Sequence, residues 1–491
     1  MKKLLCMILA LGLLAGCGAP SGQVTPPESV PVDSGTVRVQ LKDGSLTVTA
    51  PDGMAQNAVT TAYDILYDET GHGEGEAGKS HTVIHINAPG TYILSGRLEH
   101  GQIAVDLGEN AKDDPNAVVT LVLDNLDITC TVAPAVIFYN VYESGQPDGP
   151  AGAHVRLAQA SRNQLTGSHT EEYDGALYSR MSMAIDGEGF LDIKADNEGL
   201  CSERHLTING GDIFIASGND GINANADGES VVTVNGGNLT IQVTGGTGEG
   251  DGIDSNGSIV INGGTVQSYA CAASMDSGID ADLGIRINGG TVIATGNMLD
   301  RIEDGGQTYA AFQFAQPQAA GVYTLKNAAE DLVLELAVLN EFQYLLLSDP
   351  ALTEGTYTLW SGDTQFMGAP ALGGFVGGFQ PIERPDWPGR DDGDVEIPPQ
   401  PTVEYELQGA ERPAGPADMP LGQPPEGSDP SNMPAGPVPG GGTEMPMPEM
   451  PGGVRPPQDG YQGVLIPSTA LTADFAIAQG ANYFNSVQPV K

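Results

Sequence analysis

Basic residues are scarce in this chain of 491 residues: 20 Lys and Arg stand against 63 Asp and Glu, which gives a formal net charge of −43. A nucleic-acid-binding surface needs Lys and Arg to neutralise phosphates, and an anionic bilayer surface repels an acidic protein. The sequence therefore predicts no nucleic-acid partner and no contact between the folded body and a membrane.

Long apolar runs are also missing, apart from one at the N-terminus. Lys2 and Lys3 precede the apolar segment Leu4–Leu14, which is too short to span a bilayer. The segment ends in Leu14-Ala15-Gly16-Cys17, which resembles a bacterial lipobox. We expect residues 1–16 to be a lipoprotein signal peptide and a lipidated Cys17 to anchor the protein extracytoplasmically, at the cell surface; an ordinary cleaved signal is the alternative. The lipid would be the only membrane attachment.

Cysteine is rare as well. Beyond Cys6 and Cys17, only Cys130, Cys201 and Cys271 remain. An odd number excludes a complete disulfide framework, and their spacing does not fit a zinc site. We expect three buried thiols.

What the sequence has is a repeat. Asn-Gly-Gly motifs begin at Asn209, Asn235, Asn262 and Asn288, at intervals of 26, 27 and 26 residues. Runs that alternate apolar and polar residues flank each motif, which indicates short strands with one buried face. A fixed period of this size is typical of a solenoid, and Asn and Gly suit sharp corners, where stacked Asn side chains can hydrogen-bond.

A third strand in each repeat is marked by a Gly followed by Leu or Ile, at Gly199-Leu200, Gly221-Ile222, Gly252-Ile253 and Gly278-Ile279. Three strands per coil of about 26 residues predict an all-β fold, a parallel β-helix whose coils stack about 4.8 Å apart. A leucine-rich repeat is excluded because the leucine consensus is missing.

The organisation predicted for the chain follows from where this pattern begins and ends. After the signal peptide we expect a linker (17–35), an N-terminal β cap (36–81) that includes a hairpin, the β-helix (82–300), a β-rich C-terminal module (301–369), a disordered linker (370–462) and a C-terminal segment (463–491). The linker contains most of the 35 prolines and cannot bury enough apolar surface to fold alone.

Acidic residues recur beside the third strand. Aligning the repeats places Asn223, Asp254 and Asp280 above one another, with Asp220 and Asp251 three residues earlier. Stacked carboxylates about 5 Å apart resist joint ionisation, and Ca²⁺ resolves that conflict with six to eight oxygen ligands. The metal candidates are Asp220, Asn223, Asp251, Asp254, Asp276 and Asp280. A solvated acidic edge is the alternative.

These motifs carry a family resemblance. The segments Asp251–Gly257, Ile259–Val266 and Ser277–Asp280, together with Gly90–Gly96 and Leu121–Ile128 upstream, resemble a secreted bacterial carbohydrate-binding domain family. The resemblance covers about residues 82–365. It implies a calcium-binding right-handed parallel β-helix of pectate-lyase-like shape and a polysaccharide partner, with the metal at Asp220, Asp251, Asp254 and Asp280. The chain departs from the pattern at Cys201, Asn223 and Ser277.

Few residues suggest how a glycan would bind. Residues 182–297 contain only three aromatic residues, of which Phe214 should face outward beside Thr240 and Gln267. Arg286 should also point outward, and these two are the carbohydrate-binding candidates. Because the surface is acidic, the glycan should be neutral or should contact the protein through calcium-bridged uronate carboxylates.

Two other functions remain open at this point. A polysaccharide lyase needs a cation and a basic side chain to remove a proton, and the repeats offer Lys194, Arg204, His205 and Arg286. None has a visible catalytic partner, so we predict no enzyme activity. The third possibility is a calcium-rigidified spacer or adhesin.

Overall fold

All described residues belong to one compact unit. The computed structural model describes residues 36–42, 45–50, 58–64, 81–371 and 471–490. Within these ranges the chain is all-β, as predicted, with one short 3-10 helix, η1 (Glu109–Asp113), and no α-helix. No helix in these ranges is long and apolar enough to cross a membrane. The predictions for residues 1–35, including Cys17, and for residues 372–470 lie outside the described ranges.

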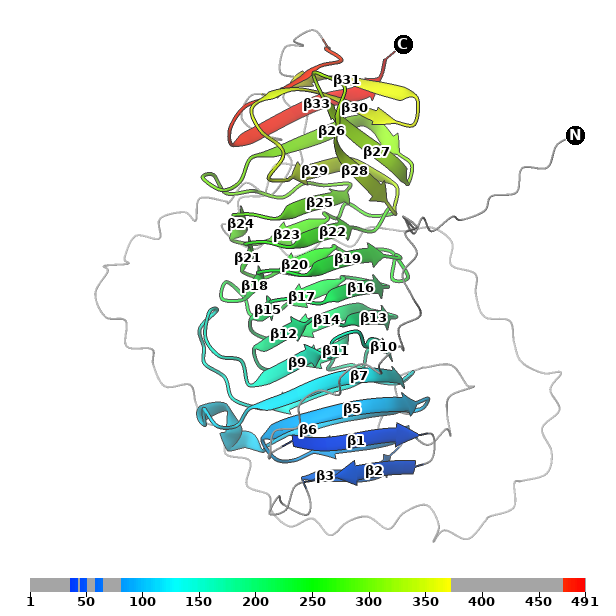
Figure 1. Ribbon diagram of the computed structural model, residues 1–491, viewed down its shortest axis with the longest axis vertical. Coiled ribbons are helices and arrows are strands. Elements are labelled where there is room, and N and C mark those ends of the chain that lie inside the picture. The colour runs from blue at the N-terminus through cyan, green and yellow to red at the C-terminus, as the bar shows by residue number, and fades with distance from the viewer. Residues whose placement is uncertain (1–35, 43–44, 51–57, 65–80, 372–470, 491) are drawn as a thin grey trace, which may run out of the picture. The chain divides into compact units, whose positions relative to one another are not determined.

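Three stacks of parallel strands make up most of the unit (Figure 1). The first stack follows the start of β7 (Val119–Thr129) with β9 (Ala153–Leu157), β12 (Met183–Gly187), β15 (Leu206–Ile208), β18 (Val231–Val234), β21 (Ser258–Ile261) and β24 (Gly284–Ile287). The second contains β5 (Gly90–Leu98), β7, β10 (Arg162–Gly167), β13 (Phe190–Ala195), β16 (Asp212–Ser217), β19 (Asn238–Val243), β22 (Thr265–Tyr269) and β25 (Thr291–Gly296). The third contains β4 (His81–Ile86), β6 (Gly101–Asp106), β8 (Val136–Asn140), β11 (Gly175–Ser179), β14 (Glu198–Ser202), β17 (Ile222–Ala224), β20 (Ile253–Ser255) and β23 (Ile279–Ala281).

The alternation of apolar residues explains this arrangement. Ile208, Val234, Ile261 and Ile287 are buried and pair in register through the first stack. Each repeat thus adds one strand to each stack, and the apolar side chains of all three stacks form one continuous core. The three predicted thiols, Cys130, Cys201 and Cys271, are free and buried.

The Asn-Gly-Gly corners behave as the sequence predicts. Asn235 Nδ2 donates to Asn209 Oδ1, Asn262 Nδ2 to Asn235 Oδ1, and Asn288 Nδ2 to Asn262 Oδ1, each at 2.8 Å. We call these four residues the asparagine ladder. The second Gly of the motif needs its freedom, because Gly237 has a φ of 86° and a Cβ there would lie 2.6 Å from Gly211 O.

The N-terminal strands extend this unit. The predicted hairpin forms from β1 (Thr36–Lys42) and β2 (Ser45–Thr49), and β1 also pairs in parallel with β5. β3 (Val59–Asp64) pairs with β4 in the antiparallel sense.

The strands that follow the repeats pair mainly in the antiparallel sense. The strands are β26 (Tyr309–Gln318), β27 (Gly321–Asn327), β28 (Leu332–Val338), β29 (Phe342–Ser348), β30 (Gly355–Ser361), β31 (Thr364–Pro370), β32 (Phe475–Ile477) and β33 (Ala481–Pro489). β29 pairs with β25 and so joins this C-terminal module to the repeats. The sequence predicted a separate C-terminal segment at 463–491, and its described part belongs to this same module. β33 pairs with β26 and β31, and its alternating apolar residues complete a separate aromatic-rich core.

Candidate functional site

The outward position of the third stack carries the predicted acidic column. Cys201, Asn223, Asp254 and Asp280 pair in register from β14 to β23. Asp251 lies just before β20, and one carboxylate oxygen from each of Asp251, Asp254 and Asp280 lies within 4.8 Å of the other two. We call these three residues the aspartate cluster. In the described ranges no Lys, Arg or His forms an ion pair with any of them.

Burial and mutual repulsion keep protons on the aspartate cluster. Removal from water raises the pKa of Asp251 to about 9, with further contributions from Asp280, Asp220 and Asp276. Burial, followed by the charges of neighbouring carboxylates, raises the pKa values of Asp254 and Asp280 to about 7. The cluster is therefore costly to ionise unless a cation compensates its charge.

One coil earlier lies a second group of oxygens. Asn223 Nδ2 donates to Glu198 Oε1 at 2.9 Å and to Asp220 Oδ2 at 3.2 Å. Glu198 Oε2 and Asn223 Oδ1 are buried without a hydrogen-bond partner. Burial, followed by the nearby acids, raises the pKa values of Glu198 and Asp220 to about 7.

Sequence reasoning missed Glu198, although the signal was present. Glu198-Gly199-Leu200 occupies the place that Asp220-Gly221-Ile222 occupies in the next repeat. Asp300, whose Oδ2 accepts the Ala281 N–H at 2.9 Å, could not have been found, because it lies beyond the last repeat.

Asp276 has a different role from the other metal candidates. Its Oδ2 accepts the Gly250 N–H at 2.5 Å and a hydrogen bond from Ser274 Oγ, so it braces two corner loops. Its carboxylate is not one of the three that lie together in the aspartate cluster.

The donor set fits a hard divalent cation. Ca²⁺ takes carboxylate, amide and carbonyl oxygens, and the aspartate cluster supplies three carboxylates. One coil away, Glu198 Oε2 and Asn223 Oδ1 are also buried without a partner and could likewise coordinate a cation. When bound, calcium would supply charge compensation between coils.

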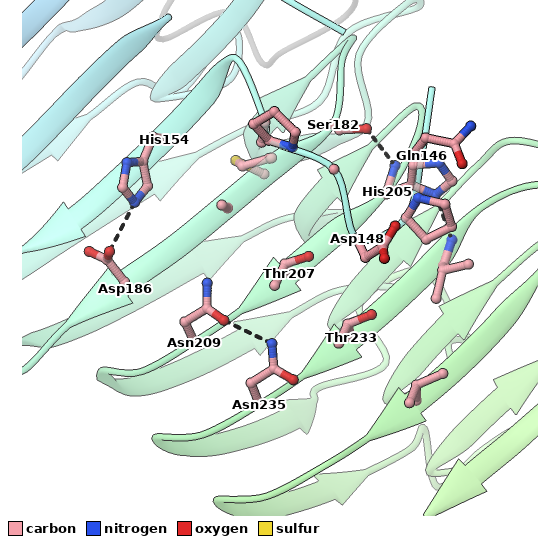
Figure 2. A pocket seen from close by; sticks show the side chains of 18 of the residues that line it. Gln146, Asp148, His154, Ser182, Asp186, His205, Thr207, Asn209, Thr233 and Asn235 are labelled. Atoms are coloured by element: carbon pink, nitrogen blue, oxygen red, sulfur yellow. Dashed lines mark hydrogen bonds and ion pairs between the residues drawn. The ribbon is translucent and has the colours of Figure 1, made fainter. Parts of the chain in front are cut away.

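A groove of about 670 Å³ lies over the first stack, and the sequence did not predict it. Its floor is one outward row, in which Ala184, Thr207, Thr233 and Val260 pair in register on four successive coils. Along one edge run Asn209, Asn235 and Asn262 of the asparagine ladder. Figure 2 shows Thr207 and Thr233 lying between the ladder and Asp148 of an overhanging loop.

The overhanging loop comprises residues 143–152, and hydrogen bonds hold its base. The Glu143 carboxylate accepts the Ser182 N–H at 2.6 Å, the Ser182 hydroxyl at 2.9 Å and the Gly145 N–H at 2.8 Å. Ser182 Oγ in turn accepts the His205 N–H at 3.3 Å. The loop is thus tied to the coils whose surface it covers, and its Pro147 and Pro150 line the groove.

The groove carries little net charge. No Lys or Arg is among the residues that line it. At one end Arg156 donates to both oxygens of Asp186, at 2.7 and 2.9 Å, which holds the pKa of Asp186 below its usual range. Burial lowers the pKa of His205, whose Nδ1 accepts the Val231 N–H. His154, which also lines the groove, lies 3.1 Å from Asp186, and Asp148 is the other acid in the lining.

The structure separates the two predicted carbohydrate contacts. Phe214 lies on the second stack, paired with Thr240, which pairs with Gln267, and it does not line the groove. Arg286 is exposed on the first stack, where it continues the floor row one coil beyond Val260.

The basic residues considered for a lyase are largely engaged elsewhere. Lys194 lies 3.2 Å from Asp192, and Arg204 lies 3.1 Å from Glu229. His205 is buried and lines the groove. None of these three forms an ion pair with the aspartate cluster in the described ranges.

Three comparisons relate parts of this chain to known proteins. Residues 80–313 match the model of a family described as "Carbohydrate-binding domain-containing protein". A protein of the same description from Acetivibrio thermocellus is 31% identical over 141 residues, which cover 27% of this chain and 44% of that relative. The match thus spans less than half of the relative's length. A solved structure of a polysaccharide lyase-like protein from C. thermocellum, a gadolinium derivative, shares 22% identity over 52% of this chain and 90% of its own, with a TM-score of 0.37. Residues 80–313 are therefore similar to a family named for carbohydrate binding.

Proposed function

We propose that this protein is a lipid-anchored, extracytoplasmic, non-catalytic polysaccharide-binding protein whose repeats form a right-handed parallel β-helix stiffened by calcium. The observation that carries the proposal is the groove over four coils of the first stack, which has both polar and apolar lining residues. The groove lies inside the region that matches the carbohydrate-binding family. Its volume is within the range of about 300–1,000 Å³ that ligand sites usually have.

Calcium enters the proposal through the aspartate cluster. Three carboxylates with raised pKa values and no ion-pair partner in the described ranges need a cation to be ionised together. The acids come from consecutive coils, so a bound ion would join coil to coil and raise the stability of the folded state.

The absence of catalysis is part of the proposal. Proton removal next to a uronate carboxylate needs a base beside the metal. Lys194 and Arg204 are each bound to a carboxylate elsewhere, and the buried His205 accepts a backbone N–H. Arg286 lies on the first stack, whereas Asp254 and Asp280 lie on the third.

The anchor and location rest on the N-terminal sequence alone. Leu14-Ala15-Gly16-Cys17 supports signal cleavage before Cys17 and lipidation of that residue. Labelling of cells with a radioactive fatty acid tests this: the protein should take up label, and Cys17→Ser should abolish uptake.

Affinity electrophoresis tests the proposed function. The secreted chain, with its signal peptide removed, is run through gels of neutral glucan, xylan and polygalacturonate, with calcium and with chelator. Retardation in at least one glycan, together with protection from heat unfolding by calcium, is expected. A folded protein that no glycan retards would overturn carbohydrate binding and leave a calcium-stiffened spacer. New absorbance from unsaturated sugar products would overturn the non-catalytic assignment.

A further inference from the structure

We infer that the groove over the first stack binds an extended chain of neutral sugar residues, lying along the stacking direction with about one ring over each coil. This inference rests on the proposed function and adds the site, the direction of the ligand and its charge class. The floor row Ala184, Thr207, Thr233 and Val260 carries short side chains on four successive coils. Neighbouring parallel strands lie about 4.8 Å apart. That spacing is close to the advance per ring of an extended glycan.

The asparagine ladder supplies hydrogen bonds at the same spacing. An amide has two N–H donors and two lone pairs on its oxygen. Asn235 uses one N–H toward Asn209 and one lone pair toward Asn262, and Asn262 is placed in the same way between Asn235 and Asn288. Each of these exposed amides keeps one donor and one acceptor for a ligand. Sugar hydroxyls act as both donor and acceptor, so the coils of Asn235 and Asn262 offer the same matched pair of bonds to the rings above them, and Asn209 at the end of the ladder adds a further amide.

The overhanging loop supplies the apolar contacts that a sugar ring also needs. Pro147 and Pro150 line the groove from the loop, and Ala184 and Val231 line it from the coils. The C–H faces of a pyranose ring pack on such surfaces, while its hydroxyls reach the ladder. Because the loop is fixed through Glu143 and Ser182, this side of the groove is formed before the ligand arrives.

Charge favours a neutral glycan over a uronate polymer. No Lys or Arg lines the groove, and the acids there are Asp148 and the already paired Asp186. The aspartate cluster lies on the third stack, and none of its residues lines the groove. A calcium ion held by the cluster is therefore not placed to bridge to uronate carboxylates in this groove. Calcium and glycan contact different faces of the coils.

A pair of substitutions on one coil tests the site. Thr233 and Thr240 are half-buried outward threonines on β18 and β19, the first in the groove floor and the second on the face that carries Phe214. Thr233→Tyr should fill the groove and weaken binding by at least about tenfold, which corresponds to about 1.4 kcal/mol. Thr240→Tyr should leave binding within about twofold of the wild type, a difference of well under 1 kcal/mol.

The measurement is calorimetric titration of the secreted chain with glucan, xylan and oligogalacturonate fragments of increasing length. Affinity for a neutral series should rise until about four rings fill the groove and then level off, and oligogalacturonates should bind more weakly. If Thr233→Tyr does not fold, Val260→Tyr with Gln267→Tyr as its control repeats the comparison one coil further on.

The outcomes separate this inference from the proposed function. If the wild type binds a glycan but Thr233→Tyr binds equally well, or Thr240→Tyr is the weaker binder, the groove is not the site and carbohydrate binding stands. Tightest binding to oligogalacturonate would overturn the neutral class. If the folded wild type binds no fragment at all, carbohydrate binding itself fails.

Discussion

Asp254 is the residue on which the calcium proposal depends most directly. It is the only member of the aspartate cluster with registered neighbours on both sides, Asn223 on one coil and Asp280 on the next. Burial and the charges of other acids act on it together. If the proposed calcium site exists, its carboxylate should therefore destabilise the chelated protein and stabilise the calcium-loaded one.

Asp254→Asn should separate these two effects. The variant should lose at least about tenfold in calcium affinity, about 1.4 kcal/mol, because a neutral amide replaces a charged ligand. In chelator it should unfold no more easily than the wild type, because a repelled carboxylate has gone. Melting curves with and without calcium measure both effects. Asp212→Asn, an exposed aspartate on β16, is the control and should change neither. Equal calcium protection in both variants would contradict the assignment.

The raised pKa values predict how pH acts on the chelated protein. The folded state holds protons on Asp254 and Asp280 up to about pH 7 and on Asp251 up to about pH 9, whereas the unfolded chain releases them near 3.8. Between these values the folded state binds more protons, so the free energy of unfolding falls as pH rises. The melting temperature in chelator should therefore drop from about pH 4 to about pH 7. Calcium should reverse this trend and protect more strongly at the higher pH. A chelated protein whose stability rises with pH over this range would contradict the buried acidic cluster.

At the scale of the strand and its corner, the second Gly of each Asn-Gly-Gly motif lets neighbouring coils approach. Gly237 has a φ of 86°, and a Cβ added to it would lie 2.6 Å from Gly211 O. Gly248 has a similar φ of 96° but open space around that position. A side chain at either glycine would therefore strain the backbone in the same way. Only a side chain at Gly237 would also collide with neighbouring atoms.

Gly237→Ala should consequently destabilise the protein more than Gly248→Ala does. Both should lose about 1–2 kcal/mol from the left-handed backbone conformation. Gly237→Ala should lose more than this, because its Cβ collides with backbone atoms of the preceding coil, which cannot move aside without opening the stack. Urea unfolding of the two variants gives the difference. Equal losses would mean that the coils relax around the new methyl group.

The repeats were predictable from sequence because a single physical rule recurs in them. Apolar residues at every second position indicate the strands and their buried face, and the Asn-Gly-Gly motif at each corner indicates how the strands align. The pairing of Asp254 with Asp280 follows from that alignment. The groove was not predictable in this way. Its overhanging loop at residues 143–152 belongs to no repeat, and only the contacts of Glu143 with Ser182 place it over the coils. Phe214 was chosen for its aromatic ring, yet its row on the second stack does not line the groove.

At the scale of the whole molecule, two cores meet at β25 and β29. The apolar interior of the coils and the aromatic core of the C-terminal module are distinct clusters, joined by antiparallel pairing between these strands. The module depends on residues far apart in sequence, because β33 inserts between β26 and β31. A smaller aromatic group, Tyr139, Tyr173 and Tyr178, lies on the coils, and the module holds the larger aromatic core.

Phe484 on β33 tests this dependence. Its ring stacks on Phe312 with centroids 5.2 Å apart and meets Phe475 edge-on at 5.0 Å. Phe484→Ala should destabilise the module by about 3–5 kcal/mol, the usual cost of removing a buried Phe. Val490→Ala, at an exposed position just after the same strand, should stay within about 0.5 kcal/mol of the wild type.

Because the two cores are separate, the effect of Phe484→Ala should be unequal across the molecule. Urea unfolding followed by the fluorescence of Trp360 on β30, in a protein whose other tryptophan, Trp387, is replaced by Phe, should shift strongly. The calcium-dependent melting of the coils should shift less, since the aspartate cluster lies on the third stack and outside the aromatic core. A Phe484→Ala variant as stable as Val490→Ala would show that β33 is not packed in the module. Equal shifts in both measurements would show instead that coils and module unfold as one cooperative unit.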